Sequence, residues 1–518
     1  MKRTNHGKVV FKEYQMNQLR LPMSLEELIP ESHLVRVVNS AIERMNIDPL
    51  VQRYKGGGTS SYHPKMMLKV LVYAYTQKVY SSRQIAKALR ENINFMWLSG
   101  NNKPDFRTIN RFRSSVIREV VNEVFTSVLE LLIQEGYVRL ENYFLDGTKI
   151  EANANKYTWV WGKTTRKNKE KLQGKIKELL EKIEKANEEE DAQYGDSDLD
   201  GLRAEGPMDS KKLEEKIREL DERLARKGKD RELTKAAKTL KGDYLPRLQK
   251  YEDQEEKLKG RNSYSKTDED ATFMRMKEDH MRNGQLKPGY NVQIGTENQF
   301  VVGYSIHQNR TDTGCLIPHL EQVKEQLGQL PKNVIADSGY GSEENYEYLE
   351  AQGVGAYVKY SNFHLEQKRS FKKDAFRVEN FPYDEEHDEF ICPAGQRLKF
   401  VRTGRHTTEN GYRTERRFYE CKDCEGCPLK ARCTRSQGNR CIRVSFRLNE
   451  LKQAAAQKLL SEEGLKLRSQ RTTEPESVFG RIKNNWSFRR FMLRGLDKVR
   501  TEWGLLSIAH NLAKLATT

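Results

Sequence analysis

The sequence of 518 residues lacks the features that would place it in a membrane or outside the cell. No apolar run approaches the ~20 residues that a membrane span requires. The segment Met1–His6 has no apolar core of the kind that a secretory signal carries, so we expect a cytoplasmic protein. The 7 cysteines are too few and too clustered for a disulfide scaffold in a chain of this length. Clustered cysteines in a reducing compartment instead indicate a metal.

An excess of acidic residues is also missing. The chain has 91 Lys and Arg against 74 Asp and Glu, which gives a formal net charge of +17 and a pI of about 9.3. A positive charge of this size favours a polyanionic partner, and nucleic acid is the first candidate. The alternative is a soluble protein that is merely basic. The length allows three or four domains and a sizeable core.

Two apolar segments each present one aspartate beside a glycine. Phe144–Thr148 contains Asp146, and Val334–Gly339 contains Asp337. A buried strand holds its side chains rigidly, and metal-dependent chemistry needs rigid, closely placed oxygen atoms. We therefore expect these two carboxylates to form two sides of a metal site. Either segment alone is a weak signal, because polar strand ends are common.

A third carboxylate is expected from Glu476, at the start of a predicted helix. Mg²⁺ is bound by hard oxygen ligands, and two aspartates need a further donor. Lys483 follows seven residues later, about two helical turns on, and so lies on the same face. A structural role is the alternative, because Thr473 and Glu476 have the spacing of a capping box and Pro475 fits a first helical turn. Glu474 is the second choice for the third carboxylate.

The first 135 residues have helical spacing and a basic segment typical of a helix-turn-helix. Ser81–Gln84 has the spacing of a capping box before a short helix, Gln84–Glu91. After a loop, Asp105 is placed as the N-cap of a basic helix. This order predicts a DNA-recognition helix, although an ordinary solvated helix has the same pattern. The side chains that could reach phosphates or base edges are those of Arg107, Asn110, Arg111 and Arg113.

Residues 163–261 are nearly balanced in charge and carry narrow apolar seams with heptad spacing. Two helices are predicted around a loop at Asp191–Ser210, and a third follows. We read this segment as an inserted helical hairpin, which could be a dimerisation arm or a passive insertion. The leucines and isoleucines of the seams are Leu172, Ile176, Leu179, Ile183, Leu213, Ile217, Leu220, Leu224, Leu233, Leu240, Leu245 and Leu248.

Strand signals return at Tyr290–Gly295 and Gln299–His307, joined as a hairpin. An amphipathic helix over Asp312–Leu327 separates them from further strands at Asn333–Asp337 and Gly355–Lys359. With the first strand at Tyr137–Ala152, this order predicts an α/β mixed sheet with helices on its faces.

Five cysteines within about forty residues indicate a zinc site. Our expected ligands are Cys392, Cys424, Cys427 and Cys433, and Cys421 could replace one of them. Cys315 lies on the apolar face of a predicted helix and is expected in the core. Cys441 has no assigned role.

The C-terminal segment interleaves basic and aromatic residues. Such a pattern can hold a phosphate backbone and stack on unpaired bases. The expected DNA contacts are Arg481, Lys483, Trp486, Arg489 and Arg490.

With these segments assembled, the chain resembles the DDE transposases of bacterial insertion sequences. Phe144–Thr148 and Ile335–Tyr340 resemble the first and second Asp motifs, and Glu476–Lys483 resembles the Glu motif with its lysine. The Cys-rich insert is similar to one branch of the family. The family often has an Arg four residues before the Glu; here that position is Thr472, which leaves the role of the adjacent Arg471 open.

The resemblance implies an RNase H-like catalytic core in a bacterial, nucleoid-associated protein. Asp146, Asp337 and Glu476 would hold two Mg²⁺ ions, which Mn²⁺ could replace. The reaction would be DNA cleavage at terminal inverted repeats and strand transfer into target DNA by a homodimer. A catalytically inactive DNA-binding regulator and an RNase H-fold nuclease without strand transfer are the alternatives.

The expected organisation is an α/β protein with large helical additions. It comprises an N-terminal helix-turn-helix-type domain, a core in three parts, the helical hairpin and a small zinc-binding insert. In chain order the ranges are 1–135 for DNA binding, 136–162 for the first part of the core, 163–261 for the hairpin, 262–361 for the second part, 362–450 for the insert and 451–518 for the C-terminal part with the Glu helix.

Overall fold

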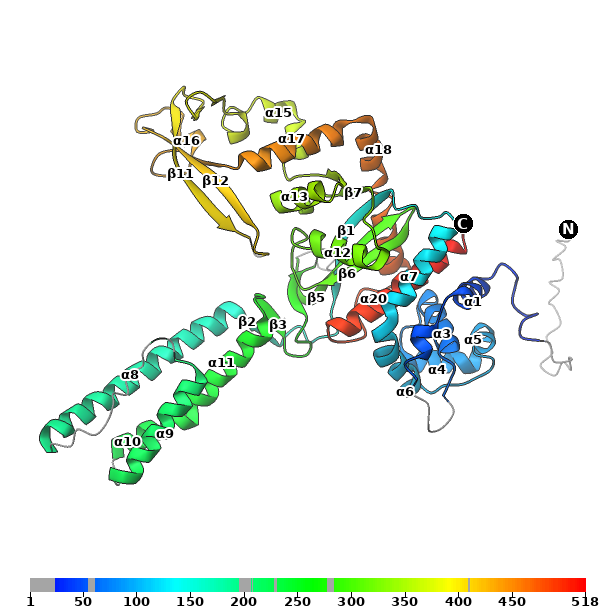
Figure 1. Cartoon of the computed structure of the whole chain (residues 1–518), viewed down its shortest axis with the longest axis horizontal. Helices are drawn as coiled ribbons and strands as arrows, with labels where there is room; N and C mark the ends of the chain where they lie inside the picture. The colour runs from blue at the N-terminus through cyan, green and yellow to red at the C-terminus, as the bar shows by residue number, and fades with distance from the viewer. Residues whose placement is uncertain are drawn as a thin grey trace, which may run out of the picture.

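The computed structural model describes residues 24–54, 61–194, 206, 208–227, 231–276, 284–408 and 410–518. A mixed sheet lies at the centre, and three additions surround it: a helical cluster, a long helical arm and a β-rich insert (Figure 1). None of the helices in these ranges is long and apolar enough to cross a membrane.

The central sheet has the strand order β6-β5-β1-β7-β8, and β4 pairs with the first residues of β5. β1 runs antiparallel to β5 and parallel to β7, and β7 runs parallel to β8, which confirms the predicted mixed sheet. The β5–β6 turn places Asn298 and Gln299 at φ of 53° and 62°, as a two-residue hairpin requires. The strands are β1 (Asn142–Glu151), β4 (Thr272–Arg275), β5 (Leu286–Glu297), β6 (Phe300–His307), β7 (Asn333–Ala336) and β8 (Gly355–Val358).

Helices cover the sheet. The fully buried middle of α20 packs against β6 on one side and against α3 and α7 on the other. The Asn511 side chain exchanges two 2.8 Å hydrogen bonds with the backbone of Val301, which fixes α20 to the sheet. The helices of this part are α12 (Leu316–Leu327), η3 (Ser338–Tyr340), α13 (Glu343–Ala351), α14 (Phe363–Glu366), α15 (Arg369–Lys372), η4 (Val378–Asn380), α17 (Phe446–Leu460), α18 (Glu462–Gln470), α19 (Pro475–Gly480), η5 (Arg481–Asn485) and α20 (Leu496–Leu515).

The N-terminal region is helical, as predicted, but its motif differs from the expected one. Asp105 caps α6 by accepting a 2.7 Å hydrogen bond from the Thr108 amide, whereas Ser81 precedes α4 without a side-chain cap bond. A further helix, α5, lies between the two predicted helices because Asn92 caps it and the side chains of Phe95 and Leu98 are buried. The elements are α1 (Leu34–Arg44), α2 (Asp48–Val51), α3 (Pro64–Thr76), α4 (Ser82–Glu91), α5 (Ile93–Leu98), α6 (Phe106–Arg111), η1 (Phe112–Ile117) and α7 (Arg118–Gln134).

The predicted helical hairpin projects from the sheet as an arm (Figure 1). Its seam residues form their own hydrophobic cluster, separate from the main core. The arm joins the fold through a short antiparallel pair, β2 (Trp159–Trp161) and β3 (Ser263–Ser265). Most of the loop predicted at Asp191–Ser210 lies outside the described residues. The arm contains α8 (Gly162–Tyr194), α9 (Ser210–Lys227), α10 (Arg231–Thr239), η2 (Leu240–Tyr244) and α11 (Leu245–Leu258).

The Cys-rich insert is built on a five-stranded antiparallel sheet of order β13-β12-β11-β10-β9, which the cysteine spacing did not predict. A small aromatic cluster fills its core. The elements are β9 (Tyr383–Asp384), β10 (Glu389–Ile391), β11 (Arg397–Thr407), β12 (Arg413–Cys421), α16 (Lys430–Cys433) and β13 (Cys441–Val444).

Two buried ionisable side chains, those of Arg113 and Glu502, lie where the N-terminal helices meet α20. Arg113 is 4% exposed and donates a 2.7 Å hydrogen bond to the Tyr80 carbonyl, so the predicted DNA contact by Arg113 is wrong. Glu502 is fully buried and accepts hydrogen bonds from the amides of Met492 and Leu493. Burial raises the pKa of Glu502 to about 7, although Arg113 acts to lower it. Arg113 therefore has a structural role.

This shift predicts a pH dependence of stability. The folded-state pKa of Glu502 lies above its ordinary value of 4.5, so protonation of Glu502 stabilises the folded state. This stabilisation is complete below pH 4.5 and is lost as the pH rises through 7. Relative to Glu502→Gln, the wild-type free energy of unfolding should fall by about 3 kcal/mol over this range. Urea unfolding followed by tryptophan fluorescence at several pH values measures the difference; parallel curves for the two proteins would contradict it.

Candidate active site

Two adjacent strands of the sheet place two carboxylates side by side. In the parallel β1–β7 pair, Phe144 is the partner of Ile335. Asp146 and Asp337 each follow two residues later, so they point from the same face at neighbouring positions. The sheet thus brings together the two aspartates that the sequence singled out.

A single arginine contacts both aspartates. An Nη atom of Arg471, at the C-terminus of α18, lies 3.2 Å from Oδ1 of Asp146 and 3.6 Å from Oδ2 of Asp337. The side chains of Arg471 and Asp146 are 11% and 18% exposed, whereas that of Asp337 is 38% exposed. Arg471 reaches the aspartates although it precedes Glu476 by one residue more than the family spacing.

Burial and neighbouring charges oppose ionisation of Asp146. The pKa of its carboxyl is raised to about 6, chiefly by burial and also by the carboxylates of Asp337 and Asp312, although Arg471 acts to lower it. Several acidic groups are therefore crowded near the ends of β1 and β7. A bound cation would reduce the repulsion between their carboxylates.

The predicted third carboxylate lies at the same cleft. α19 packs against β1, and Glu476, Lys483 and Asp146 all line one open cleft of about 510 Å³. Glu476 and Asp337 also both act to raise the pKa of Lys359, which burial lowers overall. The capping box expected from Thr473 does not form, because the N-cap of α19 is Glu474.

Glu474, the second choice, faces away from this cleft. Its carboxylate accepts hydrogen bonds from the Gln299 amide at 2.7 Å and the Thr296 hydroxyl at 3.1 Å. Glu474 therefore holds α19 against the β5–β6 hairpin.

A fourth carboxylate, that of Asp312, lines the cleft and was not predicted. Its Oδ1 accepts hydrogen bonds from the side-chain amides of Asn291 at 2.8 Å and Gln293 at 2.9 Å. The sequence interpretation assigned Asp312 to a helix, but α12 begins at Leu316 and Asp312 lies in the preceding loop. The signal in the sequence that could have identified Asp312 is its position shortly after a third apolar strand.

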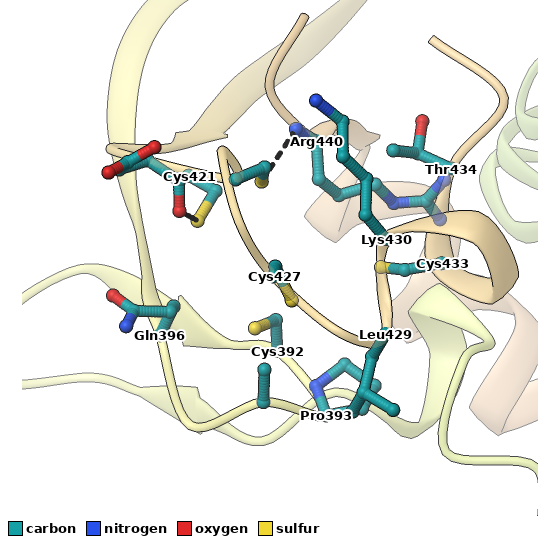
Figure 2. Close-up of a pocket in the computed structure, with 13 residues that line it drawn as sticks. Cys392, Pro393, Gln396, Cys421, Cys427, Leu429, Lys430, Cys433, Thr434 and Arg440 are labelled. Carbon is teal, nitrogen blue, oxygen red and sulfur yellow. Dashed lines mark hydrogen bonds between the residues drawn. The ribbon is translucent and has the colours of Figure 1, made fainter. Parts of the chain in front are cut away.

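The insert brings the five clustered cysteines to one small cavity (Figure 2). The Arg440 amide donates a 3.3 Å hydrogen bond to Sγ of Cys424. Burial raises the pKa of the Cys421 thiol to about 11. Cys441 is exposed, and Cys315 is buried at the start of α12, as expected. The residues at the cavity include Cys392, Cys421, Cys424, Cys427 and Cys433.

Neither the carboxylates nor the thiols are drawn together as closely as bound metal ligands. Within the described ranges, no three His, Cys, Asp or Glu side chains form a group that could hold a metal ion as they stand. The donor chemistry nevertheless suits two different ions: hard oxygens at the cleft and thiolates in the insert.

Two family models match the chain. One, described as a transposase DDE domain, matches residues 391–516, which include Glu476 and Lys483. The other, described as a transposase domain (DUF772), matches residues 23–115. Together these matches support a DDE transposase of an insertion sequence. No curated protein sequence matches this transposase. Asp146 and Asp337 lie outside both matched ranges, so their assignment rests on the sheet geometry.

The remaining predicted DNA contacts of the transposase fall into two groups. Arg107, Asn110 and Arg111 are exposed on α6 and line an open groove. Lys483 and Arg489 line the cleft that holds Asp146 and Glu476, while Arg490 is exposed near the end of β1, where it donates to the Ala152 carbonyl.

Three residues of the C-terminal segment are less accessible than expected, and one of them is Lys483, which is 8% exposed. Arg481 is half-buried on η5, and burial lowers its pKa. Trp486 is 6% exposed and its ring lies 6.3 Å from that of His510. The structure therefore places Trp486 in the core, where an indole that packs against neighbours cannot stack on a base.

A substitution at Gly147 tests how tightly the side chains beside Asp146 are packed. A Cβ at this position would lie 2.4 Å from Nε2 of Gln293 and 2.6 Å from Oδ1 of Asp312. Gly147→Ala should therefore destabilise the transposase by about 1–3 kcal/mol, as overpacking does. Thermal unfolding and hydrogen exchange at β1 measure the effect.

Gly174→Ala in α8 is the matched control, because nothing lies within 4 Å of its Cβ position. It should be neutral or slightly stabilising, since alanine favours a helix over glycine by about 1 kcal/mol. Equal stability of the two variants would show that the Gln293–Asp312 pair does not constrain Gly147.

Proposed function

We propose that the transposase cleaves DNA at the ends of its element and joins them to target DNA at a divalent-metal centre formed by Asp146, Asp337 and Glu476. The observation that carries the proposal is the shared Arg471 contact, at 3.2 and 3.6 Å, of two aspartates from neighbouring strands. Evidence for the third ligand is the position of Glu476 on the same cleft.

Bound Mg²⁺, or Mn²⁺ in its place, would activate a water or 3′-hydroxyl and stabilise the charge of the scissile phosphate. The residues of the chain prepare the site. Arg471 offsets the repulsion between Asp146 and Asp337 and directs both carboxylates to one point. Asn291 and Gln293 fix the Asp312 carboxylate at the edge of the cleft.

Lys483 and Arg489 supply positive charge on the wall of the cleft, where a DNA phosphate would lie. A phosphate held there is oriented for in-line attack, and such positioning lowers the barrier without new covalent chemistry. α6 contributes a separate surface, where Arg107 and Arg111 can contact the phosphates of an element end. Because two ends must be joined to one target, we expect a homodimer in the active complex.

Replacing the carboxylates one at a time tests the assignment. Asp146→Asn, Asp337→Asn and Glu476→Gln should each reduce cleavage by more than the roughly 10–100-fold that loss of an outer-shell partner costs. Binding of the same DNA should persist. A labelled duplex carrying the DNA that flanks the coding gene, incubated with Mg²⁺, reports both cleaved and joined strands.

Glu474→Gln is the control, since Glu474 lies two residues from Glu476 but bonds to the β5–β6 hairpin. It should retain cleavage. A wild-type protein that cleaves without producing joined strands would favour a nuclease without strand transfer, and cleavage by Asp146→Asn would refute the assignment.

We also propose that the insert holds one structural zinc ion through Cys392, Cys424, Cys427 and Cys433. Support comes from the single cavity that these thiols share with Cys421, the possible substitute ligand. The amide hydrogen bond to Cys424 is of the kind that orients a thiolate ligand. A thiolate site would fold the Cys-bearing loops around a core that is otherwise small.

Metal analysis of protein purified without chelator should find about one zinc per chain. Cys424→Ser should lower the zinc content and the melting temperature, because it removes a thiolate from the cavity. Cys441→Ser should change neither, since Cys441 is exposed outside the cavity. Absence of zinc from the wild type would reject the proposal.

A further inference from the structure

We infer that the outward face of strands β11, β12 and β13 is a DNA-contact surface that holds the phosphate backbone of the duplex as it leaves the catalytic cleft. We call this face the arginine ribbon and define it by Arg402, Arg416, Arg443 and Phe418. The inference rests on the proposed function, because it names a further part of the DNA path.

The strand register places these side chains on one face. Arg402 on β11 and Arg443 on β13 are both partners of Phe418 on β12. Their guanidinium carbons lie 4.3 Å and 5.4 Å from the centre of the Phe418 ring. Arg416, two residues before Phe418, projects from the same face beside Gly404. The result is a row of arginines around one aromatic ring.

The opposite face of these strands is already occupied. Leu398, Tyr419 and Ile442 alternate with the residues of the arginine ribbon and form the core of the insert. The three arginines of the ribbon are exposed. The arginine ribbon therefore faces solvent, because the core of the insert covers the other face of the sheet.

The pairing of charges distinguishes the ribbon from its surroundings. On the opposite face, Arg417 contacts Asp388 and Arg405 forms an ion pair with Glu415. Arg402, Arg416 and Arg443 form no ion pair with any residue that the structure describes. Arginines left without an ion pair in the ribbon, close to the ion-paired Arg405 and Arg417, are the pattern expected of a polyanion-binding surface.

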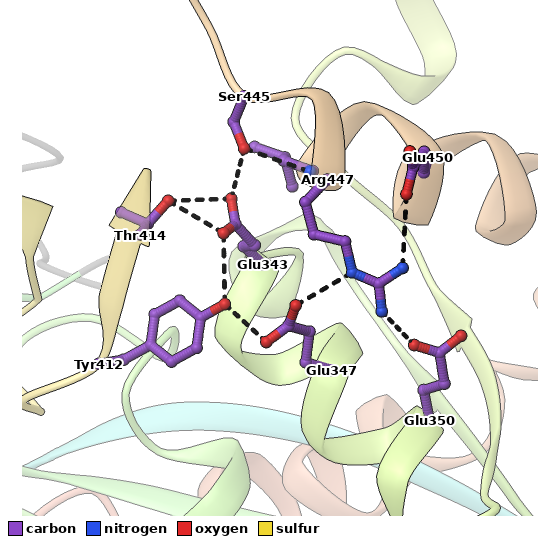
Figure 3. A network of polar contacts seen from close by, with 9 residues as sticks. Glu343, Glu347, Glu350, Tyr412, Thr414, Ser445, Arg447 and Glu450 are labelled. Carbon is purple, nitrogen blue, oxygen red and sulfur yellow. Dashed lines mark hydrogen bonds and ion pairs between the residues drawn. The ribbon is translucent and has the colours of Figure 1, made fainter. Parts of the chain in front are cut away.

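The turn end of the β11–β12 pair is fixed to α13 by a network of polar contacts (Figure 3). Tyr412 and Thr414 donate hydrogen bonds to Glu343, and Tyr412 also donates to Glu347 at 2.7 Å. These glutamates belong to α13, the helix that follows Asp337. On the other side, Arg447 of α17 binds Glu347 and Glu350.

The same end also approaches the loop that carries Asp312. The Asn410 amide nitrogen lies 3.1 Å from the position that a Cβ on Gly314 would occupy. The turn end of the β11–β12 pair thus lies near the Asp312 loop, and in our inference a duplex that leaves the cleft follows these strands to the arginine ribbon. Two-stranded β-ribbons fit the major groove of DNA, and arginine forks suit phosphate oxygens. Duplex DNA is thus the partner to which the ribbon is best matched.

The test compares two double variants of the full-length transposase that each remove two positive charges from the insert. Arg402→Ala/Arg416→Ala alters the ribbon, and Arg397→Ala/Arg405→Ala removes ion-paired arginines outside it. The probe is a fluorescent duplex carrying the DNA that flanks the coding gene, titrated by anisotropy over a range of salt concentrations.

The ribbon variant should bind at least about tenfold more weakly, and the slope of log K against log salt should fall by about 2, because each lost phosphate contact removes about 0.9. The control should keep the slope. Equal affinity and slope for ribbon variant and wild type would overturn the inference while leaving the catalytic centre intact. Failure of the wild type to bind this DNA would instead count against the proposed function.

Melting temperature and zinc content establish that the variants are folded. If the double variant unfolds, Arg416→Gln alone replaces it, since this exposed side chain is not stacked on Phe418. It should lower the salt slope by about 1. An unchanged slope for a folded Arg416→Gln protein would equally overturn the inference.

Discussion

The parallel pairing of β1 with β7 is the constraint on which the rest of the transposase depends. It fixes Asp146 and Asp337 in equivalent positions on neighbouring strands. The buried Glu297 carboxylate reinforces the entry to β1 by accepting hydrogen bonds from three successive amides, those of residues 139 to 141. α19 then packs on β1 and brings Glu476 to the same cleft. A shift of one residue in the β1–β7 register would turn one carboxylate to the opposite face of the sheet.

Several elements of this arrangement could be predicted from local pattern. Apolar runs ending in Asp identified β1 and β7, and the seam spacing identified the arm, because both signals repeat within a short stretch of chain. The spacing between Glu476 and Lys483 placed both on one side of α19 and η5, even though η5 is a π-helix. Local periodicity was sufficient wherever one element alone determined which face a side chain occupies.

Features that depend on contacts between distant segments could not be predicted. Arg113 has the position of a DNA-contacting residue on its own helix, but it is buried near Glu502, which lies almost four hundred residues later. Trp486 is similarly buried by α20. Asp312 joins the cleft only because side chains of β5 hold it there. The sheet of the insert was not predicted, because the interpretation of this segment was based on its cysteine spacing.

The narrow attachment of the helical arm has a consequence for how this transposase can vary. Both ends of the arm meet in the three-residue pairs of β2 and β3, and its apolar seams are satisfied within the arm itself. The apolar core of the arm is therefore separate from the core of the sheet. Changes in the length or outer surface of the arm should therefore leave the main core unaltered. The β2–β3 pair is the place at which another domain could be inserted instead of the arm.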